Sequence, residues 1–191
     1  MQLEILFTGI GGQGVQLASK TLALGAVSEG CQVSLTSHPG GGMRGGRTDA
    51  EVVVSDRPLT VPPIIPSAGS AFVMHPKFWP PNRARLRPEA FVVANSSLVA
   101  DSDLAGLTSY LVPASQIAMD LGNPLTASFV LLGAFCAVTG VIGVEPVIEA
   151  MAAQLPARRS QHRQANEAAI RAGHDRFPSP VHPAGYEGAP A

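Results

Sequence analysis

Residues Thr8 to Ser19 read T-G-I-G-G-Q-G-V-Q-L-A-S, and this glycine-rich turn decides the fold. It follows a short apolar run, Leu3 to Phe7, and it opens a stretch rich in alanine and leucine. A strand, a glycine turn and a helix in this order expose backbone N–H groups at the start of the helix, where an anion can bind. The turn therefore predicts an α/β domain with a polar crevice, lined by main-chain atoms, at one edge of its sheet.

A second glycine-rich loop, His38 to Gly46, reads H-P-G-G-G-M-R-G-G. Five of its nine residues are glycine, which loses too much conformational entropy for such a run to form a helix or strand. The loop places Arg44 between small neighbours, and a guanidinium group offers a rigid fork of donors to a carboxylate or phosphate. A flexible loop with a solvated arginine is the equal alternative, and Arg47 is a weaker candidate for the same role.

The rest of the chain predicts alternating strands and helices. A helix is expected from Gly14 to Glu29, and the strand from Cys31 to Leu35 would complete a right-handed βαβ unit. Further strands are expected at 48–55, 71–74, 90–94 and 110–112, an irregular or weakly helical stretch at 78–86, and helices at 115–121, 126–139, 145–154 and 157–172.

These elements predict an α/β fold of three layers, with a Rossmann-like, mostly parallel sheet, helices on both faces and a helical C-terminal segment. We expect a single domain over residues 1–176. Residues 177–191 hold four prolines and two glycines, and we expect a tail that is ordered only where it touches something.

Composition excludes several classes of protein. The net charge is −1 without a basic block, so there is no electrostatic footprint for nucleic acid. The two cysteines, Cys31 and Cys136, cannot make a disulfide framework or a four-ligand metal site, and they suit a reducing cytoplasm. The charged fraction is 14%, against about a quarter in typical domains, which favours a surface partly covered by other protein.

One apolar stretch resembles a membrane span. Leu121 to Val144 carries no charge, and its length alone would permit a span. However, Asn123 and Pro124 lie at its start, Gly140 breaks its end, and it has neither an aromatic belt nor a basic flank. We therefore expect a buried helix and no membrane segment, and the N-terminus does not read as a signal peptide.

The first turn also matches a nucleotide-binding pattern. Gly9, Gly11 and Gly14 fit G-x-G-x-x-G, which favours a dinucleotide site, although Gly12 and Gln13 depart from the usual pattern. A tight turn that packs the helix against the strand is the more frequent explanation of such glycines. Contact with another anion or with a partner protein is the third alternative.

The dinucleotide interpretation lacks its second half. It requires an acidic residue at the end of the second strand, whereas the residues at 35–38 are L-T-S-H. Asp49 lies across the second loop and is poorly placed for a ribose. The sequence also offers no G-x-S-x-G elbow, C-x-x-C pair or carboxylate pair, so no catalytic residue is predicted.

Three segments together resemble a known family. G-I-G-G-Q-G-V (Gly9 to Val15), M-R-G-G (Met43 to Gly46) and V-V-V-S-D-R-P-L (Val52 to Leu59) are similar, in this order, to the gamma subunit or domain of 2-oxoacid:ferredoxin oxidoreductases. Two later pieces, L-L-G-A at 131–134 and N-E-A-A-I-R-A-G at 166–173, fit the same family. The resemblance runs from about residue 3 to residue 173.

The resemblance implies a non-catalytic subunit of a cytoplasmic enzyme complex. Enzymes of this family decarboxylate a 2-oxoacid oxidatively, pass electrons to ferredoxin and give the acyl group to coenzyme A. Thiamine diphosphate, with Mg²⁺, would lie between alpha and beta subunits, and iron–sulfur clusters would lie on beta or on a ferredoxin-like delta subunit. This chain would hold no cofactor and no metal itself.

The resemblance also implies which loops face a ligand or partner: Gly9, Gly11, Gly12, Gln13, Gly14, Met43, Arg44, Gly45 and Gly46, with Asn123 as a secondary candidate. Many family members carry S-Y-G-P-E before M-R-G-G, whereas this chain has S-H-P-G-G-G at 37–42, which leaves partner and acceptor details open. The 2-oxoacid, the stoichiometry and direct contact with coenzyme A also stay open. A stand-alone dinucleotide-binding domain and a non-enzymatic scaffold are the alternatives.

Overall fold

The computed structural model describes residues 2–39, 45–59 and 65–182 of the 191-residue chain, without the side chains of 39 and 157–159. Its sheet has six strands in the order β2-β3-β1-β4-β5-β6. β3 is antiparallel to both of its neighbours, β2 and β1. The other three pairs, β1–β4, β4–β5 and β5–β6, are parallel. The strands are β1 (Gln2–Ile10), β2 (Gln32–Pro39), β3 (Arg47–Ser55), β4 (Ala68–Val73), β5 (Leu86–Asn95) and β6 (Thr108–Val112).

The expected βαβ unit needs a correction. β1, α1 (Val15–Ser28) and β2 follow in the expected order, but β3 lies between β1 and β2 in the sheet. The chain turns back after β2, and β3 pairs antiparallel with β2 on one side and β1 on the other. β2 therefore runs in the direction of β1 without bonding to it, a strand order that hydrophobic periodicity alone does not reveal.

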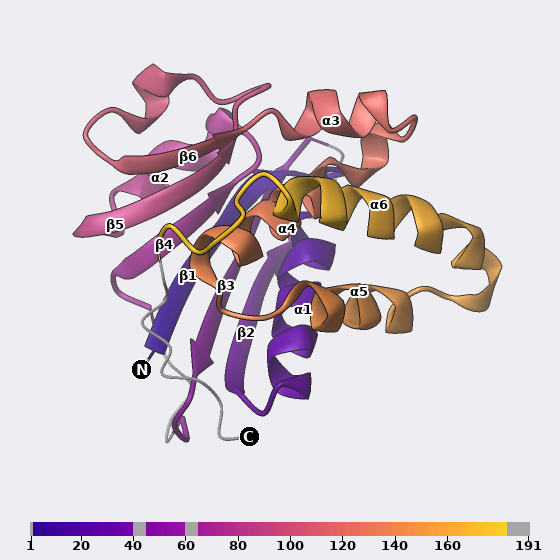
Figure 1. Cartoon of the computed structure of the whole chain (residues 1–191). Coiled ribbons are helices and arrows are strands. Elements are labelled where there is room, and N and C mark those ends of the chain that lie inside the picture. The colour runs from indigo at the N-terminus through magenta and orange to yellow at the C-terminus, as the bar shows by residue number, and fades with distance from the viewer. Residues whose placement is uncertain (1, 40–44, 60–64, 183–191) are drawn as a thin grey trace.

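One face of the sheet carries the main helical layer (Figure 1). It is formed by α1 with α3 (Ala114–Asp120), α4 (Ala127–Thr139), α5 (Val144–Ala153) and α6 (Arg163–His174). The core beneath it includes Phe7, Phe72 and Phe135, whose ring centroids lie 4.7–6.4 Å apart. This close aromatic packing anchors the helices to the middle strands of the sheet.

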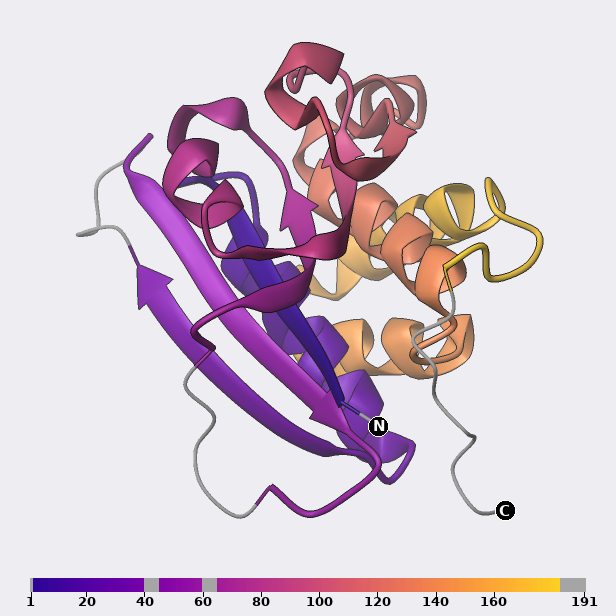
Figure 2. The same ribbon diagram turned by 90° about the vertical axis from the view of Figure 1, so that its left-hand side faces the viewer.

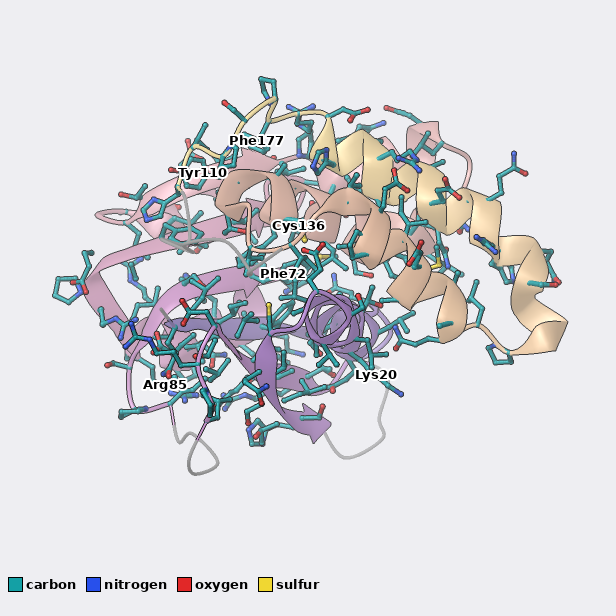
Figure 3. The ribbon with its side chains drawn as sticks, turned by 60° about the horizontal axis from the view of Figure 1, so that its bottom comes forward. Lys20, Phe72, Arg85, Tyr110, Cys136 and Phe177 are labelled. Atoms are coloured by element: carbon teal, nitrogen blue, oxygen red, sulfur yellow. The ribbon has the colours of Figure 1, made fainter. Side chains whose placement is uncertain are left out.

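Helix α4 is the apolar stretch that resembled a membrane span. All of its 13 residues are buried, which explains why it shows no polar face. Figure 3 shows Cys136 of α4 and Phe72 of β4 in the packed interior. At 1.5 Å per residue the helix is about 20 Å long, shorter than a bilayer core of about 30 Å. Among the described residues, no helix has both the length and the apolar character needed to cross a membrane.

Helices α4 and α6 cross at unusually close range. A Cβ atom built on Gly133 would lie 1.9 Å from the carbonyl oxygen of Ile170, and one built on Gly173 would lie 1.8 Å from that of Val130. Only glycine leaves room for two backbones to approach so closely. The L-L-G-A and N-E-A-A-I-R-A-G segments therefore meet at one helix crossing.

The opposite face of the sheet carries a thinner layer (Figure 2). It consists of the short helix α2 (Trp79–Arg83) with the 3₁₀ turns η1 (Pro76–Phe78) and η2 (Asp101–Leu104). Trp79 packs with Leu6, Val53 and Leu104 in a second, smaller core, and its indole N–H donates to the carbonyl of Asp103 at 3.0 Å. The three-layer, mostly parallel α/β fold expected from the sequence is confirmed.

The C-terminal region differs from expectation in one element. The helix expected at 157–172 is a 3₁₀ turn, η4 (Ala157–His162), followed by α6. Residues 160–162 of this turn are exposed, so no apolar burial is available there to sustain an α-helix.

Part of the expected tail packs against the fold. The N–H groups of Val181 and His182 both donate to the carbonyl of Val138, at 3.1 and 2.9 Å. Phe177 meets Tyr110 of β6 edge to face, with ring centroids 6.1 Å apart, and both are labelled in Figure 3. Residues 177–182 therefore lie along the end of α4 and the β6 side of the sheet.

Candidate functional site

The two glycine loops lie together at one edge of the sheet. β1 ends there at Ile10, and β3 begins there at Arg47, its partner in the register. The N–H of Gly11 donates to the carbonyl of Gly46 at 2.8 Å, and the N–H of Gly45 donates to the carbonyl of Gly11 at 3.2 Å. These reciprocal main-chain bonds join the loops into one surface, called here the glycine edge (Gly9 to Gly14 with Gly45 and Gly46).

The glycines of the first turn allow helix α1 to start close to its neighbours. A Cβ on Gly9 would lie 2.7 Å from the Val15 side chain, and one on Gly14 would lie 2.5 Å from the hydroxyl of Ser128 in α4. Gly14 also has a φ of 78°, which L-residues rarely adopt. The turn thus brings β1, α1 and the first turn of α4 together.

Gln13 closes the first turn on itself. Its side-chain oxygen accepts the N–H of Ile10 at 3.1 Å, and its own N–H donates to the carbonyl of Ile10 at 3.2 Å. The N–H of Ile10 is thereby already occupied and is not offered to a ligand. Together with the insertion of β3 beside β1, this geometry speaks against a dinucleotide site of the Rossmann kind.

A buried polar network lies beneath the glycine edge, and sequence reasoning did not find it. The Thr8 hydroxyl donates to Oδ1 of Asp49 at 2.8 Å, and Nε of Arg47 donates to Oδ2 at 2.5 Å. Nδ2 of Asn82 lies 3.1 Å from the Thr8 hydroxyl and 3.3 Å from Oδ2 of Asp49. Asp49 is only 4% exposed, and buried carboxylates require such partners. The available signal was the polar alternation R-T-D-A-E at 47–51 within a strand.

A pocket of about 390 Å³ opens beside this network. A second ion pair crosses it, between Nη1 of Arg85 and Oε1 of Glu51 at 2.8 Å, and His38 lies 3.7 Å from the same oxygen. The pocket is lined by His38, Arg47, Asp49, Ala50, Glu51, Asn82 and Arg85. Both carboxylates have a guanidinium partner, so the pocket walls are nearly balanced in charge.

Asn123, the secondary candidate, has a local structural role. Its side-chain oxygen accepts the N–H of Leu125 at 3.2 Å and caps the 3₁₀ turn η3 (Pro124–Thr126). Three large apolar side chains around it are exposed, and we call them the α3–η3 apolar cluster: Met119, Leu121 and Leu125. Leu125 is 80% exposed and lies three residues before Ser128, which adjoins Gly14. Leu125 therefore lies about one helical turn from a residue that contacts the glycine edge, and it is the cluster member nearest to that edge in the chain.

Two candidate residues, Met43 and Arg44, fall outside the described residues. Their neighbours Gly45 and Gly46 are described and lie against Gly11. In the chain, Met43 and Arg44 directly precede these two glycines.

The residues of this chain do not fit an iron–sulfur cluster. Such clusters need about four thiolate ligands, and the chain has two cysteines, one just before β2 and one in α4. Burial raises the pKa of the Cys136 thiol, so it does not present a thiolate. In the part of the chain that the structure describes, no group of three or more histidine, cysteine or acidic side chains could hold a metal ion.

The fold and the site define a class of protein: an α/β domain with paired glycine turns at one edge of its sheet and too few cysteines to ligate an iron–sulfur cluster. The chain belongs to the pyruvate ferredoxin/flavodoxin oxidoreductase family, which it matches over residues 4–176. It is 31% identical over 157 residues to the pyruvate/ketoisovalerate oxidoreductases common subunit gamma of Thermococcus litoralis, covering 78% of this chain and 84% of that one.

Two further comparisons agree. The chain is 27% identical over 160 residues to the 2-oxoglutarate synthase subunit KorC of Methanocaldococcus jannaschii, covering 82% of this chain and 85% of that one. The crystal structure of the keto/oxoacid ferredoxin oxidoreductase gamma subunit from Geobacter sulfurreducens superposes with a TM-score of 0.76 at 25% identity, covering 92% and 98% of the two chains. The gamma-type resemblance drawn from the sequence is confirmed, in preference to a stand-alone dinucleotide-binding domain.

Proposed function

We propose that this chain is the gamma subunit of a thiamine-diphosphate-dependent complex that oxidises a 2-oxoacid to an acyl-coenzyme A and reduces ferredoxin. Alpha and beta subunits carry thiamine diphosphate and Mg²⁺, and iron–sulfur clusters lie on beta or on a ferredoxin-like delta subunit, all in the cytoplasm. Residues 1–176 act as one gamma-type domain and 177–191 as its tail. The observation that carries the proposal is the family match over residues 4–176, and the main-chain bonds of Gly11 with Gly45 and Gly46 indicate the face involved.

The chemistry of the glycine edge suits docking and access rather than bond making. The described part of the edge offers main-chain groups and small residues, so another chain or a ligand can approach the backbone closely. The adjoining α3–η3 apolar cluster adds exposed apolar surface of the kind that marks interaction sites. We infer that this combined face meets the catalytic subunits and shapes the approach of coenzyme A or the 2-oxoacid.

Leu125 tests the docking face directly. Leu125→Asp places a charge where the proposal requires apolar contact, and co-purification with the catalytic subunits should fall about tenfold or more, as for a central interface residue. Val27→Asp is the matched control, because Val27 is also exposed but lies about 18 Å further along α1, at 1.5 Å per residue from Val15. Equal recovery of both variants with the partner subunits would exclude this docking face.

Arg44 tests the ligand-facing part of the proposal. In the reconstituted complex, Arg44→Ala should lower turnover or raise the KM for coenzyme A, because a donor fork for a carboxylate or phosphate is lost. Lys20→Ala is the control, since Lys20 is an exposed cation on α1 that points away from the fold (Figure 3). Unchanged kinetics for Arg44→Ala would remove Arg44 from the site.

The substrate is identified by assay. The complex should reduce ferredoxin or viologen with one of a panel of 2-oxoacids, among them 2-oxoglutarate, pyruvate and branched 2-oxoacids, and should form the corresponding acyl-coenzyme A. Turnover by this chain alone would overturn the proposal, because it assigns the chemistry to other subunits.

A further inference from the structure

We propose that Asp49 is a positioning residue for the glycine edge. It holds Arg47 and Thr8 in place, and through them it fixes Gly45 and Gly46 against the first glycine turn for docking. The inference rests on the proposed function, in which this edge meets the catalytic subunits.

The position of Asp49 in the sheet is the first support. Asp49 lies directly opposite Thr8 in the β1–β3 register, and Arg47 lies opposite Ile10, the last residue of β1. Each glycine turn therefore departs from the strands two residues beyond the Thr8–Asp49 pair. A contact at this place controls the relative position of both turns, because it clamps the two strands at their common end.

The contacts of Asp49 are the second support. Its two carboxylate oxygens accept from the Thr8 hydroxyl on β1, from Nε of Arg47 next to Gly46, and from Nδ2 of Asn82 on α2. Its backbone carbonyl accepts from Nε2 of Gln16, in the first turn of α1, at 2.6 Å. One residue thus links β1, α1 and α2 to the base of the second glycine loop.

The chemistry of the side chain is the third support. Three donors converge on Asp49, and only a carboxylate offers two acceptor oxygens with no donor of its own. In Asp49→Asn, an amide NH₂ would face at least one of these donors, so a buried hydrogen bond would be lost at nearly unchanged volume. The Arg47 guanidinium, whose side chain is 48% exposed, would then face a neutral amide in place of a carboxylate, so its charge-assisted bond at Nε would be weakened.

The same pocket contains a matched control. Glu51 and Arg85 form an ion pair of comparable length, and Glu51 lies two residues further from the glycine edge on the same strand. Within the described residues, this pair contacts His38 and the carbonyl of Ile65, and it hydrogen-bonds to neither Thr8 nor Gln16. Glu51→Gln therefore removes a carboxylate from the pocket without changing a contact of Gly45, Gly46 or Arg47 at the C-terminal end of the loop.

The test measures assembly of the full chain with the other subunits of its complex. Asp49→Asn and Arg47→Ala should each raise the dissociation constant about tenfold, the size of effect that one charge-assisted hydrogen bond commonly carries. The double variant should be no weaker than either single one, because both break the same link. Glu51→Gln should assemble like the wild type.

The outcomes separate this inference from the function on which it rests. If the wild-type chain does not join the complex, the proposed function fails. If the wild type assembles and Asp49→Asn or Arg47→Ala assembles equally well, the positioning role is wrong. If Asp49→Asn has a melting temperature far below that of Glu51→Gln, the assembly of Arg47→Ala tests the positioning role instead. The Arg47 side chain is half-exposed, so its truncation leaves the core unchanged. Additive losses in the double variant would also overturn the link.

Discussion

Glycine serves opposite purposes in two parts of this molecule. At the crossing of α4 and α6, a Cβ on Gly133 would lie 1.9 Å from a backbone oxygen, so the residue is required for space. At the glycine edge, a Cβ on Gly45 would meet nothing within 4 Å, but its φ is 76°. There the residue is required for its backbone torsion. Glycines that look alike in a sequence motif can therefore be distinguished by what surrounds them.

The segments that resemble the family fall into two groups, one in the helical layer and one at the edge of the sheet. The segment N-E-A-A-I-R-A-G lies in α6, where Ala169 is fully buried and Gly173 contacts α4. Its Asn166 is also buried, with Nδ2 3.6 Å from the sulfur of Met151. These residues build the helical layer. The candidate site residues of the first turn lie elsewhere, at the edge of the sheet, together with Gly45 and Gly46 of M-R-G-G.

Gly133→Ala should have the largest effect. The added methyl group clashes with the backbone of α6, which cannot yield as a side chain would, and we expect a loss of about 3–5 kcal/mol in the free energy of unfolding. Urea titration measures it. Gly25→Ala is the matched control within a helix. Its new Cβ meets the flexible end of Ile142 at 2.9 Å and the backbone oxygen of Pro146 only at 3.3 Å, and we expect a change below about 1 kcal/mol. Similar losses in both variants would contradict the claim that Gly133 is required because no larger residue fits between α4 and α6.

Gly45→Ala should cost less, because only the left-handed backbone is affected. We expect a loss of about 1–2 kcal/mol. Gly45→Asn is the control, since asparagine tolerates this conformation better than alanine, and it should retain more of the stability. The two thermal unfolding midpoints give the order. Equal midpoints for Asn and Ala would show that torsion does not limit this position.

Cys136 provides a smaller, pH-dependent probe of the helical layer. Burial, together with the nearby carboxylate of Glu29, raises the pKa of its thiol in the folded state. The unfolded thiol ionises from about pH 8.5, so the free energy of unfolding should fall above that pH by about 1.4 kcal/mol per unit from this group. Below pH 8.5 the contribution is constant. Urea titrations of wild type and Cys136→Ala under reducing conditions should differ by a constant amount at lower pH, and only the wild-type value should fall in addition at alkaline pH. Profiles that stay parallel throughout would contradict the prediction.

The sequence predicted most elements because their patterns are local. The uninterrupted apolar run of α4, bounded by Pro124 and Gly140, indicated a buried helix, and the structure buries every residue of that helix. The glycine turns were predicted from their high glycine content. Strand order was not available in the same way, since nothing local to β3 states that it pairs with β1 as well as with β2.

The polar network was out of reach for the same reason. Thr8, Asp49 and Asn82 are separated by 41 and 33 positions in the chain, and only the folded sheet brings them together. The position of Asp49 even spoke against a dinucleotide site, because the residue is poorly placed to bind a ribose hydroxyl. Long-range pairing of single polar residues leaves no periodicity to detect. The roles of the glycine edge, Met43, Arg44 and Asn123 stay predictions.

The bonds between Gly11 and the second loop join peptide groups alone. Peptide groups are common to every residue type, so substitutions along S-H-P-G-G-G would leave this joint formally intact. An insertion or deletion, which displaces the peptide groups themselves, would part the loops. Substitutions that keep the length of the loop are therefore a route by which such chains change partners while these main-chain bonds stay in place.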